Sequence, residues 1–137
     1  MGLEQQVCSL ELSTKLKELG FEKESLFYWG EESGLRNNYQ PRICTDLSKW
    51  DDDNMIVVCP AYTVAEMGEM LPHRLKEEAR ATDYKTHYSL EISKDKTWWE
   101  VCYQGGGDAG NRGFFNDASL VNAMAKMLIY LKENNLI

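Results

Sequence analysis

The amino-acid sequence predicts an α+β fold, a layered sandwich of helices packed on an antiparallel sheet with a C-terminal hairpin. Amphipathic helix patterns occupy both ends of the chain, over residues 7–20 and 117–137. Between them lie short β-rich runs, one shorter helix motif and two runs that can pair as the hairpin. With 137 residues and no internal repeat, the chain has the common size of one domain, so a single α+β domain over residues 1–137 is expected.

The first helix is predicted to begin near Ser9 and to end at Gly20. Serine often caps a helix N-terminus, and glycine readily adopts the left-handed conformation that ends a helix. One face of this helix collects the apolar residues Cys8, Leu12, Leu16 and Leu19. The aromatic run at residues 26–29 then predicts a short strand.

A loop and two strands are predicted next. Residues 30–41 contain glycines, two asparagines and a proline, a composition that indicates a loop. Residues 43–47 are predicted as an edge strand. The β-rich run at residues 55–59 predicts a buried strand that ends before Pro60.

A second helix is predicted from Thr63 to the residue before Pro72. Thr63 and Glu66 have the spacing of a capping box, in which two side chains satisfy backbone N–H groups at the helix start. Proline disfavours helical geometry in the residue before it, so it marks the end. The expected buried face consists of Val64, Met67, Gly68 and Leu71.

A hairpin is predicted over residues 86–103, with Lys94 and Asp95 as a two-residue turn. The pairs on its mostly apolar face are then Ile92 with Thr97, Leu90 with Trp99, Tyr88 with Val101 and Thr86 with Tyr103. Lys-Asp is a weaker turn signal than Asn-Gly. The opposite face is polar except for Trp98.

The closing helix has the clearest pattern, with Asn116 or Asp117 as its predicted N-cap. Apolar residues recur along it at helical spacing and form a stripe that a sheet or another helix must cover. They are Leu120, Ala123, Met124, Met127, Leu128 and Leu131.

A glycine-rich segment, residues 105–113, is predicted to lie between a strand and the closing helix. Backbone N–H groups in such a position can hold phosphate, with Arg112 as charge partner. The segment lacks the Gly-Lys-Ser/Thr ending of a P-loop, and a plain connection is the favoured interpretation. Its candidate ligand-binding residues are Gly105, Gly106, Gly107, Asn111 and Arg112.

Tryptophans outside the core are candidate interface anchors, and we assign this role to Trp98 and Trp50. In the predicted register Trp98 lies on the polar face of the hairpin. Because burial of an indole is favourable, we expect the first helix or another subunit to cover it.

The sequence predicts no catalytic residue, no metal site and no cofactor. Cys102 and His87 face each other in the predicted register, but no third residue orients them, and packing is the favoured explanation. Cysteines occur at four separated positions, Cys8, Cys44, Cys59 and Cys102. Without a close ligand pair, we expect reduced thiols rather than a zinc site.

The net charge is −7, from 22 acidic and 15 basic residues. Lysines and arginines never cluster, so nucleic acid is not an expected partner, whereas a basic partner surface would suit this charge. No apolar run approaches the roughly 20 residues of a membrane span, and no signal peptide is evident. We therefore expect a cytoplasmic protein that does not contact a membrane.

Three motifs carry a resemblance: CSLELSTKLKELG followed by SLFYW, then TVAEMGEMLP, and AKMLIYLKEN near the end. With them the chain resembles a family of small uncharacterised proteins encoded by tailed phages and bacterial prophages. The resemblance implies a phage or prophage source and the fold, but no site residues.

Two functions are therefore considered. The first is a non-enzymatic binding or assembly module in the host cytoplasm, acting on host defence or regulation, and forming a homo-oligomer or binding a host protein. The alternative is a binder of a nucleotide or other anionic small molecule at residues 105–113, with or without turnover.

Overall fold

The computed structural model describes residues 2–32, 39–43, 55–76, 87–106 and 110–137 of the chain. These residues form helices and two antiparallel sheets, so the predicted α+β class is confirmed. In chain order the elements are η1 (Leu3–Gln5), α1 (Leu10–Glu18), β1 (Phe27–Glu32), β2 (Tyr39–Ile43), β3 (Met55–Pro60), α2 (Val64–Met70), β4 (Arg74–Lys76), β5 (His87–Lys94), β6 (Trp99–Gly105), β7 (Asn111–Asp117) and α3 (Leu120–Glu133).

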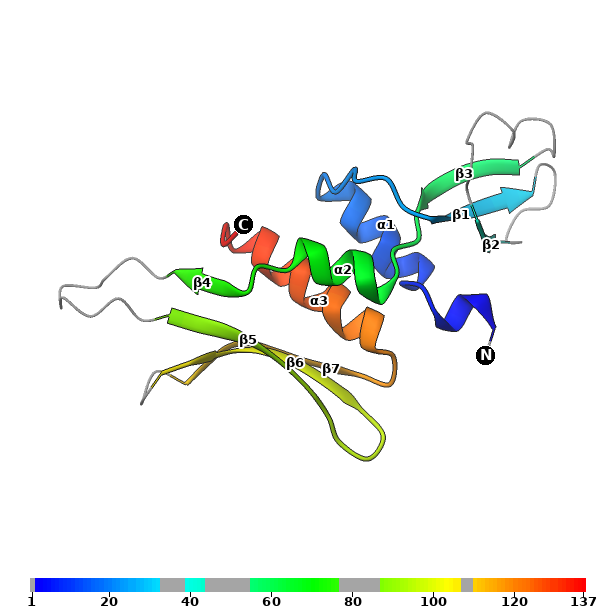
Figure 1. The fold of residues 1–137 in the computed structure, drawn as a ribbon. Coiled ribbons are helices and arrows are strands. Elements are labelled where there is room, and N and C mark those ends of the chain that lie inside the picture. The colour runs from blue at the N-terminus through cyan, green and yellow to red at the C-terminus, as the bar shows by residue number, and fades with distance from the viewer. Residues whose placement is uncertain (1, 33–38, 44–54, 77–86, 107–109) are drawn as a thin grey trace.

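The strands belong to two sheets, and the prediction of one sheet for all of them is wrong. One sheet has the order β2-β1-β3, and the other has the order β4-β5-β6-β7. Figure 1 shows the first sheet beyond α1 at one end of the molecule, and the second on the other side of the helices. A β-rich run shows where a strand lies, but long-range contacts decide which strands pair, and local pattern does not contain them.

Helix α3 is the centre of the larger hydrophobic core. It packs on β6 and β7 of the four-stranded sheet and also contacts α1 and α2 (Figure 1). Its buried residues are Val121, Ala123, Met124, Ala125, Met127, Leu128 and Leu131. The predicted apolar stripe is thus confirmed, except that Leu120 is only half-buried. Burial reaches further around the helix than predicted because both helices and sheet cover it.

Two of the three predicted helix starts are confirmed. The Ser9 hydroxyl accepts a hydrogen bond from the first turn of α1, and Thr63 and Glu66 form the full capping box of α2. The N-cap of α3 is Ser119 rather than Asn116 or Asp117. The Asp117 carboxylate instead accepts a hydrogen bond from the Ser119 N–H, at 2.9 Å.

The buried face of α2 is smaller than predicted. Met67 and Leu71 are buried, whereas Val64 and Gly68 are exposed. The first turn of α2 faces a depression beside Trp99 and the start of α3 instead of a covering element, which explains the exposure of Val64.

The predicted hairpin register is wrong, although the predicted faces are right. Leu90 pairs with Tyr103 instead of Trp99, and the loop holds residues 95–98 instead of a two-residue turn. A two-residue turn needs positive φ angles, and none of these loop residues adopts one. Since the shift is an even number of residues, every side chain keeps its face. The buried inward-facing residues are Tyr88, Val101 and Tyr103.

The predicted loop at residues 30–41 is wrong in part, because Gly30 lies in β1 and Pro41 lies in β2. In the described sheet β2 is an outer strand, where the missing N–H of proline is tolerated. Of the predicted strand at residues 43–47, only Ile43 falls within the described residues, as the end of β2. The predicted strand at 55–59 is confirmed as β3, which continues to Pro60. The prediction that this strand is buried is wrong, because Ile56 is 56% exposed and Cys59 is the one buried side chain among its described residues.

Candidate functional site

The glycine-rich segment joins two strands, so its predicted position before a helix is wrong. It leads from β6 into β7, and the Gly105 N–H donates to the Gly110 carbonyl at 2.8 Å. No helix N-terminus follows it directly, which removes the geometric basis of the phosphate-cradle interpretation. Gly106 and Asn111 are exposed and Arg112 is half-buried, whereas Gly107 lies outside the described residues. Anion binding at this turn stays a prediction.

The end of this segment is a β-bulge centred on Gly113. Cys102 pairs with Phe114 and Tyr103 with Arg112, so Gly113 is the extra residue in β7. Its φ angle is +68°, a conformation that favours glycine. A Cβ here would lie 3.0 Å from the Tyr130 ring of α3, so the close packing of β7 on α3 also requires glycine.

The candidate interface residue Trp98 does not join the glycine-rich segment in one site. Trp98 lies in the β5–β6 loop, at the opposite end of β6 from Gly105, and is 50% exposed. The prediction that the first helix covers Trp98 is therefore wrong, and coverage by another subunit stays a prediction. Trp50 lies outside the described residues.

The structure does not bring Cys102 and His87 together as a pair. Cys102 pairs with Glu91, and His87 pairs with Lys76 on β4, so the predicted Cys102–His87 neighbourhood is wrong. Burial raises the pKa of the Cys8 thiol to about 12, which makes it a poor nucleophile at neutral pH. The described part of the chain contains no group of three His, Cys, Asp or Glu side chains arranged for a metal ion.

A groove of about 800 Å³ between α1, α3 and β7 is the best-formed candidate site. Its apolar lining consists of Leu10, Leu12, Phe115, Ile129 and Tyr130. The rings of Phe115 and Tyr130 lie 5.7 Å apart in a tilted arrangement, which joins the β7 side of the groove to its α3 floor. Ile129 and Tyr130 are only half-buried, so part of their apolar surface remains available to another molecule.

Charged side chains surround the apolar part of the groove. Lys15 on α1 forms an ion pair with Glu133 on α3, with the charged atoms 3.1 Å apart. Glu11 and Glu18 also line the groove, and neither forms an ion pair with a described residue. The α1 wall therefore keeps a surplus of negative charge.

The other lysine of the groove, Lys126, is held by Asp117 at the end of β7, at 2.8 Å. Burial alone would raise the pKa of the Asp117 carboxyl. Hydrogen bonds from Lys126 and from the Ser119 N–H outweigh that effect and hold this pKa below its usual range. Both lysines that line the groove thus have acidic partners within the chain.

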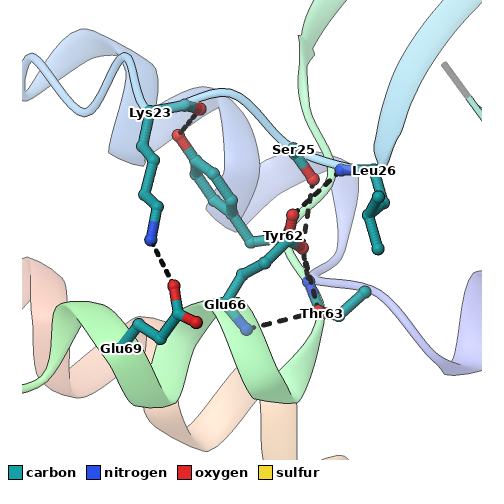
Figure 2. Close-up of polar contacts among 7 residues, drawn as sticks. All are labelled: Lys23, Ser25, Leu26, Tyr62, Thr63, Glu66 and Glu69. Atoms are coloured by element: carbon teal, nitrogen blue, oxygen red, sulfur yellow. Dashed lines mark hydrogen bonds and ion pairs between the residues drawn. The ribbon is translucent and has the colours of Figure 1, made fainter. Parts of the chain in front are cut away.

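A second polar cluster joins α2 to the segment before β1, and it acts as a structural clamp (Figure 2). The Glu66 carboxylate accepts hydrogen bonds from the N–H groups of Leu26 and Thr63, at 2.9 and 2.8 Å. It also accepts from the hydroxyls of Ser25 and Thr63, at 3.1 and 2.9 Å. Three of these donors meet Oε2 and one meets Oε1, so the carboxylate ties α2 to the segment before β1.

Two further bonds hold the same segment. The Tyr62 hydroxyl donates to the Lys23 carbonyl at 2.7 Å, and the Lys23 ammonium lies 2.6 Å from the Glu69 carboxylate (Figure 2). Burial raises the pKa of Tyr62 to about 12, so this hydroxyl remains a donor at neutral pH.

Comparison of the chain with protein-family models, with curated proteins and with solved structures finds no match. None of the helices in the described part of the chain combines the length and the apolar character that crossing a membrane requires.

The groove itself was not predicted from the sequence. Its residues come from three elements far apart in the chain, so no local motif joins them. One signal was present: Ile129 and Tyr130 are large apolar residues that fall outside the buried stripe of the closing helix. An apolar residue outside the stripe of an amphipathic helix needs a further covering surface.

Proposed function

We propose that this chain is a non-enzymatic binding module whose α1–α3–β7 groove holds a segment of a partner protein. The observation that carries the proposal is the apolar groove with its half-buried Ile129 and Tyr130. Exposed apolar surface gathered in a groove and rimmed by charge is typical of protein interaction sites. The absence of a predicted catalytic constellation in the sequence favours binding over turnover.

The charge around the groove determines the kind of partner. Glu11 and Glu18 carry the surplus charge of the α1 wall, and the whole chain has a net charge of −7. A segment with apolar residues and lysines or arginines would complement both features, and its association would be fastest at low salt. The phage or prophage source that the three sequence motifs imply points to a host protein of defence or regulation as this partner.

The proposal can be tested with two designed peptides, one of leucine and lysine and one of leucine and glutamate. We expect the lysine peptide to bind in calorimetry and the glutamate peptide not to bind. The change Ile129→Asp should abolish binding. Val64→Asp, which introduces the same side chain at an exposed apolar position on α2, should leave it intact. Equal binding of both peptides, or binding that survives Ile129→Asp, would refute the proposal.

A further inference from the structure

Strand β7 borders the groove and is an outer strand of the four-stranded sheet as far as the described residues show. The strand at the opposite side, β4, has three residues in the described part of the chain, whereas β7 has seven. In an outer strand, every second residue directs its backbone N–H and C=O away from the sheet, where another chain can bond them. Beyond its bulge, β7 contains no proline or lysine of the kind that usually protects such an edge. The Asn116 carbonyl accepts a hydrogen bond from the Lys126 ammonium of α3, at 3.3 Å.

The two phenylalanines of β7 lie on opposite faces of the sheet. Phe115 pairs with the buried Val101 and its ring lines the groove against Tyr130. Phe114 pairs with Cys102 on the other face and is 49% exposed. The groove and the exposed ring therefore lie on the two sides of one strand edge.

We propose that the partner segment binds as an added strand along β7 at Phe114–Asp117, in an extended conformation and not as a helix. This inference rests on the proposed function and specifies how the groove is filled. Alternate side chains of an added strand point to opposite faces of the sheet. One set of side chains enters the groove beside Phe115, and the other set covers Phe114. A helix lying in the groove would reach only the first of these surfaces.

The chemistry of the added strand follows from its neighbours. Groove-facing positions meet Ile129 and Tyr130 and require apolar residues, with a lysine or arginine where the segment passes Glu11 or Glu18. The residue opposite Phe114 is aromatic or β-branched, since such cross-strand pairs are favourable.

A second copy of the chain is a poorer occupant on electrostatic grounds. It would bring its own β7, whose residues beyond the bulge are Phe114, Phe115, Asn116 and Asp117 and include no cation. Each copy also carries a net charge of −7, so like charges would meet at the interface.

The experiment compares two lysine-containing peptides of equal composition. One alternates apolar and basic residues with a period of two, and the other places them with the period of a helix. We expect the alternating peptide to bind more tightly. Phe114→Ser should weaken that binding roughly threefold to fivefold, the effect of losing one cross-strand aromatic pair. Ser93→Ala, an exposed change on β5, which β6 separates from β7, should leave binding unaltered, and melting curves should show that both variants fold.

Backbone methylation then tests the mode of binding directly. N-methyl groups are placed on the odd residues of the alternating peptide in one version and on the even residues in another. An added strand bonds β7 along one edge only, so one version should bind and the other should lose binding by about tenfold or more. Equal effects of the two versions, or tighter binding of the helical peptide, would overturn the added strand and leave the groove proposal standing.

Two further outcomes separate this inference from the proposed function. If no peptide shows binding sensitive to Ile129→Asp, the groove proposal fails and the added strand fails with it. If the free chain sediments as a dimer that Phe114→Ser converts to a monomer, the edge is occupied by a second copy and the assignment to a partner protein is overturned.

Discussion

Replacing Glu66 with alanine should destabilise the protein by about 2–3 kcal/mol. The carboxylate accepts two backbone N–H groups, from Leu26 at 2.9 Å and from Thr63 at 2.8 Å. A hydrogen bond to a charged group contributes about 1.5–3 kcal/mol when buried. Glu66 is only half-buried, so water competes and each bond is taken near the lower value.

The other donors to Glu66 add little to this sum. The Ser25 hydroxyl has a second acceptor, the Ala61 carbonyl at 3.3 Å, which remains available in the variant. Alanine is a better helix former than glutamate, so a loss of stability cannot come from helix propensity. The loss must therefore come from the bonds that the carboxylate accepts, one from the capping box of α2 and one from the segment before β1.

Thermal unfolding followed by circular dichroism measures this effect. We expect Glu66→Ala to lower Tm by roughly 6–12 °C and Glu66→Gln, which retains one acceptor oxygen, to lower it by less. The matched control is Glu69→Ala, three residues further along α2, whose carboxylate is exposed and bonds only Lys23 among the described residues. A Tm for Glu66→Ala equal to that of Glu69→Ala would refute the clamp.

Three further predictions concern other parts of the fold. In urea unfolding, Gly113→Ala should lower the free energy of unfolding by about 2–4 kcal/mol, because position 113 has a positive φ and the new Cβ would lie 3.0 Å from Tyr130. The control Gly106→Ala has open space around it and should have little effect. Acidification should remove the stability that Asp117 contributes, because the pKa of this carboxyl is lower in the folded than in the unfolded chain. Its contribution is complete above about pH 4 and declines as the pH falls through the pKa of the folded state. Asp117→Asn should flatten this pH dependence, and an unchanged pH profile of Tm would contradict the assignment. Cys8 should react with a thiol reagent only on unfolding, since it is fully buried with a pKa near 12, and rapid labelling of the native protein would show that the N-terminal segment opens.

The features that the sequence predicts well are those determined within a few residues. The capping box of Thr63 and Glu66 and the glycine end of α1, where Gly20 has a φ of +90°, depend on neighbours three or four positions away. The stripe of α3 is similarly visible because its period is that of a helix. These signals identify the helices without knowledge of what they pack against.

Strand β7 shows why the sheet and the site were harder to predict. Its sequence Asn-Arg-Gly-Phe-Phe-Asn-Asp has no β-branched residue and no alternation of apolar and polar side chains. It is a strand because β6 pairs with it and α3 covers it, with Gly113 allowing the close approach. Since the glycine-rich segment was expected to lead directly into the helix, both this strand and the groove beside it went unpredicted.

Helix α3 has one surface buried in the core and another that lines the groove, and this difference allows binding to be separated from folding. Residues such as Leu128 and Leu131 are completely buried, so any polar substitution there would unfold the protein before it changed an interface. Ile129 and Tyr130 are half-buried and point into the groove, where part of their surface already meets water. An aspartate at position 129 can keep its charge hydrated at that surface, so the cost to folding is smaller than in the core while the apolar contact with a partner is lost. We therefore expect Ile129→Asp to lose binding while it still unfolds cooperatively. That combination would identify the groove as an interface.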